Sequence, residues 1–359
     1  MLNFLNSVGR IMRFRLIFSV ILAFSLANLC GCGSPQRLTW HLKPGDTYSI
    51  KVHLISDLSM IFGGVDHKDS EMLLSCRVKE AGPRQILIEA TIASVRASMS
   101  SLGKKFSFDS NQTSSPEPKK KPKTEQQQTF TNAFAGLKGK KFTVRMDFQQ
   151  PMAELVEMDA QIKKAAYAGA GGDMIGGDQV NMLLAEGNLR EYVTGGLMVG
   201  PKAAPAQLNA TWESPGSVLV PYAPVTATNK SYTVESVPNQ QDNQEQQDSR
   251  IALIKYKLTR DQVPSAQTKA PKAPKASNPR KPRRRTSKLT FNVDSVKGQG
   301  DLTYSLSNGR PIKLVEKTRV FVSSRARSRR PTSAKISSHK RPKPNIFYTV
   351  QKTIEYIDN

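Results

Sequence analysis

The sequence predicts a strand-rich α+β protein, in which one antiparallel sheet is backed by two or so helices. Segments with alternating apolar and polar side chains recur along the chain, which is the period of half-buried strands. The middle third changes to helical spacing, and the last segment alternates again. We expect a curved sheet with the form of a half-barrel, in one domain from residue 38 to 359. A split near residue 200 is the alternative.

The beginning of the chain has the organisation of a secretory signal. Arg13 and Arg15 precede an apolar run, residues 16–29, which is shorter than the ~20 residues of a membrane-spanning helix. The run ends in Leu29-Cys30-Gly31-Cys32, which is similar to the bacterial lipoprotein signal. We expect residues 1–31 to be the signal peptide, Cys32 to be lipidated, and residues 32–37 to be a flexible tether.

Alternatives remain for this segment. An ordinary signal peptide or a short membrane anchor shares its basic start and apolar middle. Cys30 is a rival lipidation site, although a large residue precedes it where the pattern has a small one. Met12 is a better-placed start than Met1. Gly33 follows Cys32 in place of the Asp that is associated with inner-membrane retention, which favours delivery to the outer membrane.

A first meander of strands follows the tether. Residues 38–43 and 48–54 alternate on either side of the turn Pro44-Gly45-Asp46, so we expect them to form a hairpin. Further alternating segments predict strands at residues 70–79, 85–99, 105–109 and 142–148.

The period changes at Pro151, a residue that suits the first turn of a helix. Apolar residues recur near helical spacing over residues 152–162, and a glycine-rich segment, 169–177, ends this predicted helix. Asp178 is placed to cap a second helix, whose apolar stripe extends to Leu189.

Extended structure returns at Trp212 and continues to the end of the chain. Asn308-Gly309 is a strong hairpin signal. In the last strand, Ile346, Tyr348, Val350, Ile354 and Tyr356 share the face that we expect to be buried. The predicted strands of this part are residues 226–237, 251–258, 289–293, 300–306, 312–322 and 346–357.

Four polar segments are predicted to be disordered excursions, at about residues 110–129, 239–249, 264–288 and 324–344. The last two carry most of the positive charge. The chain has a net charge of +24, and the seventeen cations within residues 265–288 and 325–343 account for all but +7 of it. The folded part is therefore only mildly basic.

These basic segments are the candidate polyanion-binding region. They contain no aromatic residue for stacking on bases, and an exported protein rarely meets DNA, so we expect anionic lipid or cell-wall polymer rather than nucleic acid as partner. The alternative is a solvated loop that only keeps the surface charged. The candidate residues are Arg280, Lys281, Arg283, Arg284, Arg285, Arg325, Arg327, Arg329 and Arg330.

No pattern predicts catalysis, a metal site or a cofactor. The four histidines are not at metal-ligand spacing, and no carboxylate pair stands out for acid–base work. The glycine-rich segment lacks the strand, Lys and Ser or Thr of a phosphate loop. Cys76 lies in an apolar run and is predicted to be a buried structural thiol.

The segment from Leu42 to Tyr48, directly after a lipoprotein signal, resembles the opening of an uncharacterised family of bacterial secreted lipoproteins. Its members share a later Trp-centred turn, here Thr211-Trp212, and a Gly-x-Gly strand near the end, here Gly298-Gln299-Gly300. The family has no assigned catalytic residues, so the resemblance implies an envelope location but no reaction.

These observations predict a non-enzymatic lipoprotein of the bacterial cell envelope, anchored in a membrane and facing the periplasm. The first hypothesis is a binding or carrier module for an apolar or lipid-like ligand, which requires an apolar cavity between sheet and helices. The alternative is a structural envelope protein whose basic loops bind anionic lipid or cell-wall polymer. It requires a filled core and salt-sensitive surface binding. A hydrolase would need a polar cluster that the sequence does not show.

Overall fold

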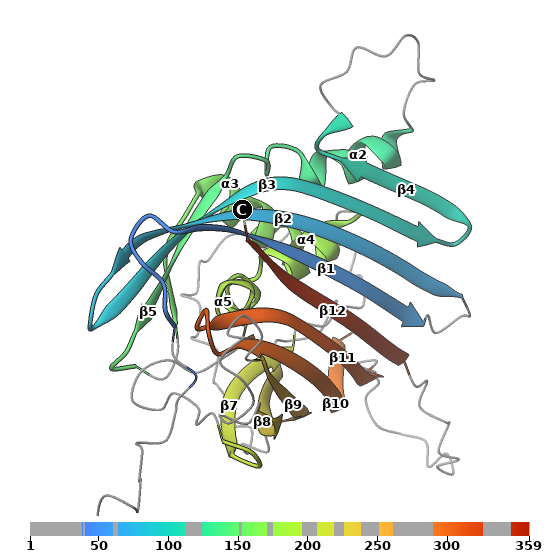
Figure 1. Ribbon diagram of the computed structural model, residues 1–359. Helices are drawn as coiled ribbons and strands as arrows, with labels where there is room; N and C mark the ends of the chain where they lie inside the picture. Colours follow the sequence, from blue (N-terminus) through green and yellow to red (C-terminus); the bar gives the residue numbers. More distant parts are fainter. Residues whose placement is uncertain are drawn as a thin grey trace, which may run out of the picture. The chain divides into compact units, whose positions relative to one another are not determined.

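The alternating segments pair into one antiparallel sheet of twelve strands in the computed structural model (Figure 1). The strands are β1 (Thr47–Ser59), β2 (Val65–Ala81), β3 (Gln85–Ser101), β4 (Lys104–Asp109), β5 (Lys141–Asp147), β6 (Glu154–Met158), β7 (Thr211–Val218), β8 (Thr226–Ser236), β9 (Ile251–Arg260), β10 (Thr290–Ser305), β11 (Arg310–Arg325) and β12 (Ile346–Asp358).

The structure describes residues 38, 40–59, 64–112, 124–150, 153–170, 175–195, 207–218, 226–237, 251–260, 290–325 and 346–358. Contacts group the chain from Leu38 to Asn359 into one compact unit. The predicted signal, the lipidation site and the excursions 239–249 and 264–288 lie outside the described residues.

The last strand joins two meanders at the centre of the sheet. The strand order is β6-β5-β3-β2-β1-β12-β11-β10-β9-β8-β7, with β4 paired to β3 outside this path. β12 therefore lies between β1 and β11, and it pairs antiparallel with both of them. The sheet is strand-rich and antiparallel, as predicted, and β6 and β7 are the ends of its strand order. The half-barrel curvature stays a prediction.

Helices pack against one face of the sheet. Figure 1 shows α2 (Glu125–Phe134), α3 (Ala160–Ala170), α4 (Gly177–Leu184) and α5 (Glu186–Thr194). On α4, the Gln179 side-chain amide donates to the Ser70 hydroxyl of β2, at 2.5 Å. On α5, the Tyr192 carbonyl accepts from Tyr356 of β12, at 2.7 Å. The apolar face of β12 is buried as predicted, with Tyr348 and Ile354 at 0% exposure.

The predicted first hairpin is wrong. Residues 40–43 are not a strand, because both neighbours of β1 are already taken by β2 and β12 and leave no edge for a further strand. Their alternation instead reflects burial, since Leu38 and Trp40 contact the core from an irregular segment. The turn at Pro44-Gly45 is present, with the Asp46 amide donating to the Lys43 carbonyl at 3.1 Å.

The first predicted helix begins later than expected. Glu154–Met158 forms the edge strand β6, which pairs with the free edge of β5. The pattern of apolar residues in this short segment is compatible with a helix or a strand, so the available backbone partners determine its structure. Asp159 follows, and its carboxylate accepts from the Gln161 amide at 2.7 Å, at the start of α3.

The second predicted helix is two helices, because Ala185 adopts an extended backbone (φ −58°, ψ 135°) between α4 and α5. The Asn188 side chain donates to the Met182 carbonyl at 2.5 Å, where α4 ends. The described part of the chain thus has four helices rather than two.

The predicted excursion at residues 110–129 is wrong at both ends. Ser110 is buried, and its hydroxyl accepts from the Val95 amide at 2.9 Å. Thr124 caps α2 by accepting from the Gln127 amide at 3.2 Å. Phe130 packs against Phe106 of β4, with ring centroids 5.9 Å apart. The burial of this aromatic residue, just after the polar run, stabilises the helix. Residues 113–123 lie outside the described residues.

The Gly-x-Gly segment is part of one long strand, β10, rather than a break between two strands. Gly300 faces the ring of Tyr256 on β9, and a Cβ at Gly300 would lie 2.4 Å from that ring. Glycine is therefore required by packing at this position.

We expect Gly300→Ala to lower the free energy of unfolding by about 1–3 kcal/mol, because the added methyl forces the Tyr256 ring out of a filled core. Urea unfolding measures the change. Gly82→Ala is the matched control, since its Cβ would meet only the Gln85 carbonyl, at 3.9 Å. Equal stability of the two variants would contradict this packing.

Candidate anion-binding face of the sheet

The face of the sheet opposite the helices carries two transverse rows of polar side chains. In the first, Lys297, Arg319, Thr349 and Asp57 follow one another across β10, β11, β12 and β1. We call it the basic row. In the second, the amide row, the order is Gln299, Lys317, Gln351 and Ile55. On β11, Glu316, Thr318 and Val320 are buried on the helix-covered face of the sheet. Side chains alternate along a strand, so Lys317 and Arg319 are on the opposite face.

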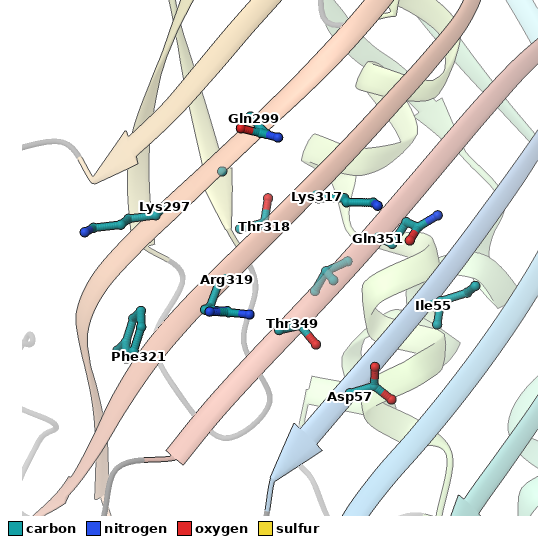
Figure 2. A pocket seen from close by; sticks show the side chains of 12 residues that line it. Ile55, Asp57, Lys297, Gln299, Lys317, Thr318, Arg319, Phe321, Thr349 and Gln351 are labelled. Atoms are coloured by element: carbon teal, nitrogen blue, oxygen red, sulfur yellow. The ribbon is translucent and has the colours of Figure 1, made fainter.

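These two rows line a surface pocket of about 730 Å³. Figure 2 shows the side chains of the rows in front of the sheet, with helices behind it. Phe321 and Ile55 add apolar surface to the lining. The pocket therefore combines three cations with neutral hydrogen-bond donors and apolar contacts.

The cations of this pocket lack acidic partners within the described part of the chain. Lys297 and Arg319 are directly opposite each other on β10 and β11, and Lys317 lies two residues before Arg319 on the same face. No ion pair joins any of the three to a described acid. Like charges directly opposite each other destabilise a sheet. An anion bound between them would remove this repulsion.

One carboxylate lies in the basic row, but it faces another group. The Asp57 carboxylate accepts from the ring of His67 on β2, with 2.8 Å between Nδ1 and Oδ1. Two exposed lysines elsewhere on β11 and β9 are paired: Lys313 is 2.6 Å from Glu355, and Lys255 is 2.7 Å from Glu235. Lys297, Lys317 and Arg319 differ from these two lysines in having no acidic partner among the described residues.

A second polar cluster lies on the helix-facing side of the same strands. Lys230 of β8 contacts the carboxylates of Glu191 and Glu316, at 2.5 and 2.8 Å. Lys352 of β12 contacts the same two carboxylates, at 2.9 and 3.3 Å. The Tyr256 hydroxyl donates to Glu316 at 2.6 Å. We call these two lysines and two glutamates the ionic ring.

The ionic ring is suited to structure rather than to proton transfer. Burial by itself raises the pKa of Glu316, but the ammonium groups of Lys230 and Lys352 outweigh it and hold this pKa far below its usual range. Burial lowers the pKa of Lys230, and Glu191 and Glu316 outweigh it and raise this pKa well above its usual value. Both groups stay charged near neutral pH, so neither is a poised acid, base or nucleophile.

Cys76 is buried, with 1% exposure, as predicted. Burial raises the pKa of its thiol, so the nucleophilic thiolate is disfavoured. Among the described residues, no three His, Cys, Asp or Glu side chains are grouped to hold a metal ion. No helix in the described ranges is long and apolar enough to cross a membrane.

Most of the predicted site residues lie outside the described residues. They are Cys32, Arg280, Lys281, Arg283, Arg284, Arg285, Arg327, Arg329 and Arg330. Arg325 is the last residue of β11, opposite Thr290. Sequence reasoning missed Lys297, Lys317 and Arg319, because Lys297 lies between two predicted strands and the other two are single cations in the predicted strand 312–322. Only the register between β10 and β11 brings them together.

No protein-family model and no curated protein matches the chain. A solved structure titled for lipid–protein interactions in lipovitellin is similar over 88% of this chain and 26% of its own, with 8% identity and a TM-score of 0.35. An outer membrane channel from Pseudomonas putida F1 is similar over 89% of this chain and 98% of its own, with 7% identity and a TM-score of 0.23. At this level, neither similarity supports an argument about function.

Proposed function

We propose that the chain is a non-enzymatic, lipid-anchored protein of the cell envelope that binds phosphate-bearing anions on the outer face of its sheet. The observation that carries this proposal is the pair Lys297 and Arg319, placed directly opposite each other without an acidic partner among the described residues. Such an arrangement is unfavourable in the free protein and becomes favourable around an anion.

The packing on the other face favours this function over a carrier of apolar ligands. An apolar carrier needs an empty cavity between sheet and helices. Among the described residues, Val180 and Leu183 of α4 belong to the same hydrophobic cluster as Met72 and Leu74 of β2. Apolar packing of a helix on the sheet, with a charged outer surface, is what the structural-protein hypothesis requires.

The donors of the pocket suit phosphate. A guanidinium presents paired donors to two phosphate oxygens, and an ammonium supplies a point charge. Arg319 and Lys317 provide these groups, and the amides of Gln299 and Gln351 add neutral donors on either side. Phe321 and Ile55 can contact the apolar part of a phosphate ester. A lipid head group and a phosphate-bearing wall polymer share this chemistry.

The strand ends also connect the pocket to the basic segments. Arg260 of β9 and Thr290 of β10 flank residues 261–289, and Arg325 of β11 and Ile346 of β12 flank residues 326–345. The registers place these four ends at the same end of the sheet. The basic segments thus attach beside the pocket and add long-range attraction for a polyanion.

We expect Lys317→Gln to weaken phosphate binding at the pocket about 5-fold, since a surface cation contributes ~1 kcal/mol to such binding. Titration of the full chain with tripolyphosphate at low salt, followed by amide chemical shifts of residues 297, 317, 319 and 349, measures this. The shifts report the pocket separately from the basic segments.

Lys313→Gln is the matched control, because Lys313 is on the same strand and face but is paired with Glu355. It should leave the titration unchanged. If the pocket amides do not shift in the unsubstituted protein, or if the two variants weaken binding equally, the pocket is not the site. A parallel titration with short-chain phosphatidylglycerol tests whether a lipid head group is the source of the phosphate.

A further inference from the structure

One more row of side chains on this outer face lies at the end of the sheet that carries the basic segments. It continues the alternation beyond the basic row. Phe321 pairs with Phe347, and the Phe347 amide donates to the Ser59 hydroxyl at 3.3 Å. Ser59 pairs with Val65. His67 of β2 pairs with Ser100 of β3. Two residues further along this antiparallel pair, the same register places Val65 opposite Leu102.

Apart from Ser59, the members of this row are apolar, and three of them are exposed. Phe347, Val65 and Leu102 expose 41%, 55% and 76% of their surfaces. We call Phe321, Phe347, Val65 and Leu102 the apolar rim. It extends across β11, β12, β2 and the tip of the β3–β4 hairpin, while the basic row lies two residues further into the sheet.

Leu102 is the least expected of these residues. The hairpin turn between Ser101 and Lys104 has positive φ at both central residues, 48° at Leu102 and 77° at Gly103. Asn or Gly followed by Gly is favoured in such a turn, and Leu is not. Leu102 also contributes nothing to the core, because its side chain is the most exposed large apolar group described. Neither turn geometry nor burial accounts for leucine here.

We propose that the apolar rim enters the interface of an anionic lipid bilayer, so that this end of the sheet faces the membrane. Apolar side chains at the head-group boundary combined with nearby cations are the two contributions that bind proteins to anionic membranes. The rim supplies the first and Lys297, Lys317 and Arg319 supply the second. The inference deepens the proposed function and rests on it, because the pocket provides the charge.

The test places an environment-sensitive fluorescent amino acid, Anap, at position 102 of the full chain bound to phosphatidylglycerol vesicles. We expect a blue-shifted emission and several-fold stronger quenching by acyl chains labelled with bromine than at position 308. Asn308 is the control because it is exposed in the turn at the opposite end of β10 and β11. Position 65 provides a second rim site if the label disturbs the hairpin.

Vesicles of pure phosphatidylcholine, and high salt, should reduce the quenching at positions 102 and 65. Equal quenching at positions 102, 65 and 308 would overturn the proposal. The two proposals fail separately: if tripolyphosphate shifts the pocket amides while the rim labels are not quenched, the bilayer proposal is overturned and the proposed function stands, with a soluble polyanion as the ligand. If the rim labels are quenched equally on neutral and anionic vesicles, the anionic-lipid specificity is overturned.

Discussion

Replacing Lys230 with Met is expected to lower the free energy of unfolding by about 3–5 kcal/mol. Lys230 is 5% exposed and contacts two carboxylates, from α5 and β11. Its removal leaves Glu191 and Glu316 with the single ammonium of Lys352, so one negative charge is buried without compensation. Urea unfolding followed by circular dichroism measures the loss.

A second substitution separates this charge effect from lost packing. In Lys230→Met/Glu316→Gln, Lys352 and Glu191 remain as a balanced pair 2.9 Å apart, and the new amide oxygen at position 316 still offers an acceptor to Tyr256. The double variant should therefore be more stable than Lys230→Met alone. Lys255→Met, which removes an exposed lysine from neighbouring β9, should change stability little. A loss in Lys230→Met no larger than in Lys255→Met would refute the role of the ionic ring.

The ionic ring also sets a pH dependence. The pKa values of Glu191 and Glu316 are lowered in the folded protein, because Lys230 and Lys352 outweigh the effect of burial. Their contribution is present above the unfolded Glu pKa of about 4.3 and is lost as the pH falls below it. The raised pKa of Lys230 acts at the other end, since its contribution is lost only as the pH rises above about 10.4.

Replacing Cys32 with Ala is expected to abolish lipid attachment and to release the protein from the membrane fraction. The expectation rests on the sequence Leu29-Cys30-Gly31-Cys32 after an apolar run. Intact mass and fractionation of the natively expressed protein measure both effects. Fractions should be washed at high salt, because the basic surface can retain the variant on anionic membranes and salt screens that attraction.

Cys30→Ala is the matched control for this experiment, since Cys30 is the rival site two residues away. It should leave the acylated mass unchanged. If Cys32→Ala stays acylated, Cys30 is the modified residue. If neither variant changes the mass and both stay in the membrane fraction, the segment is an uncleaved signal anchor.

The strands were predictable from local patterns. Gln85 to Ser101 alternates regularly enough that β3 was expected within two residues, and Asn308-Gly309 placed the β10–β11 turn. The helices were less predictable. The pattern of residues 154–158 is compatible with a helix or a strand, and pairing with the free edge of β5 makes this segment a strand. Helix α2 begins in a polar run, and tertiary contacts with β4, those of Phe130 with Phe106 and of Phe134 with Phe108, stabilise it in place.

The sequence showed an excess of basic residues but not which of them form the candidate site. The densest cations, such as Arg283 to Arg285, led to the prediction that the basic segments bind a polyanion. Lys297 and Arg319 are 22 positions apart in the sequence and have no distinguishing neighbours there. They become a site because the β10–β11 register makes them opposite each other. Lys230 of β8 and Glu316 of β11, in the ionic ring, also come together only in the folded sheet.

The sequence by itself determined the strand-rich class, the buried Cys76, the burial of one face of the last strand, and the expectation of an exported, lipid-anchored chain. Each of these follows from residues that are close along the chain. The tertiary structure alone decided the position of β12 between β1 and β11, the unpaired cations of the pocket, the apolar rim and the ionic ring. These features depend on which strands become neighbours and in which register, and long-range pairing energy sets both.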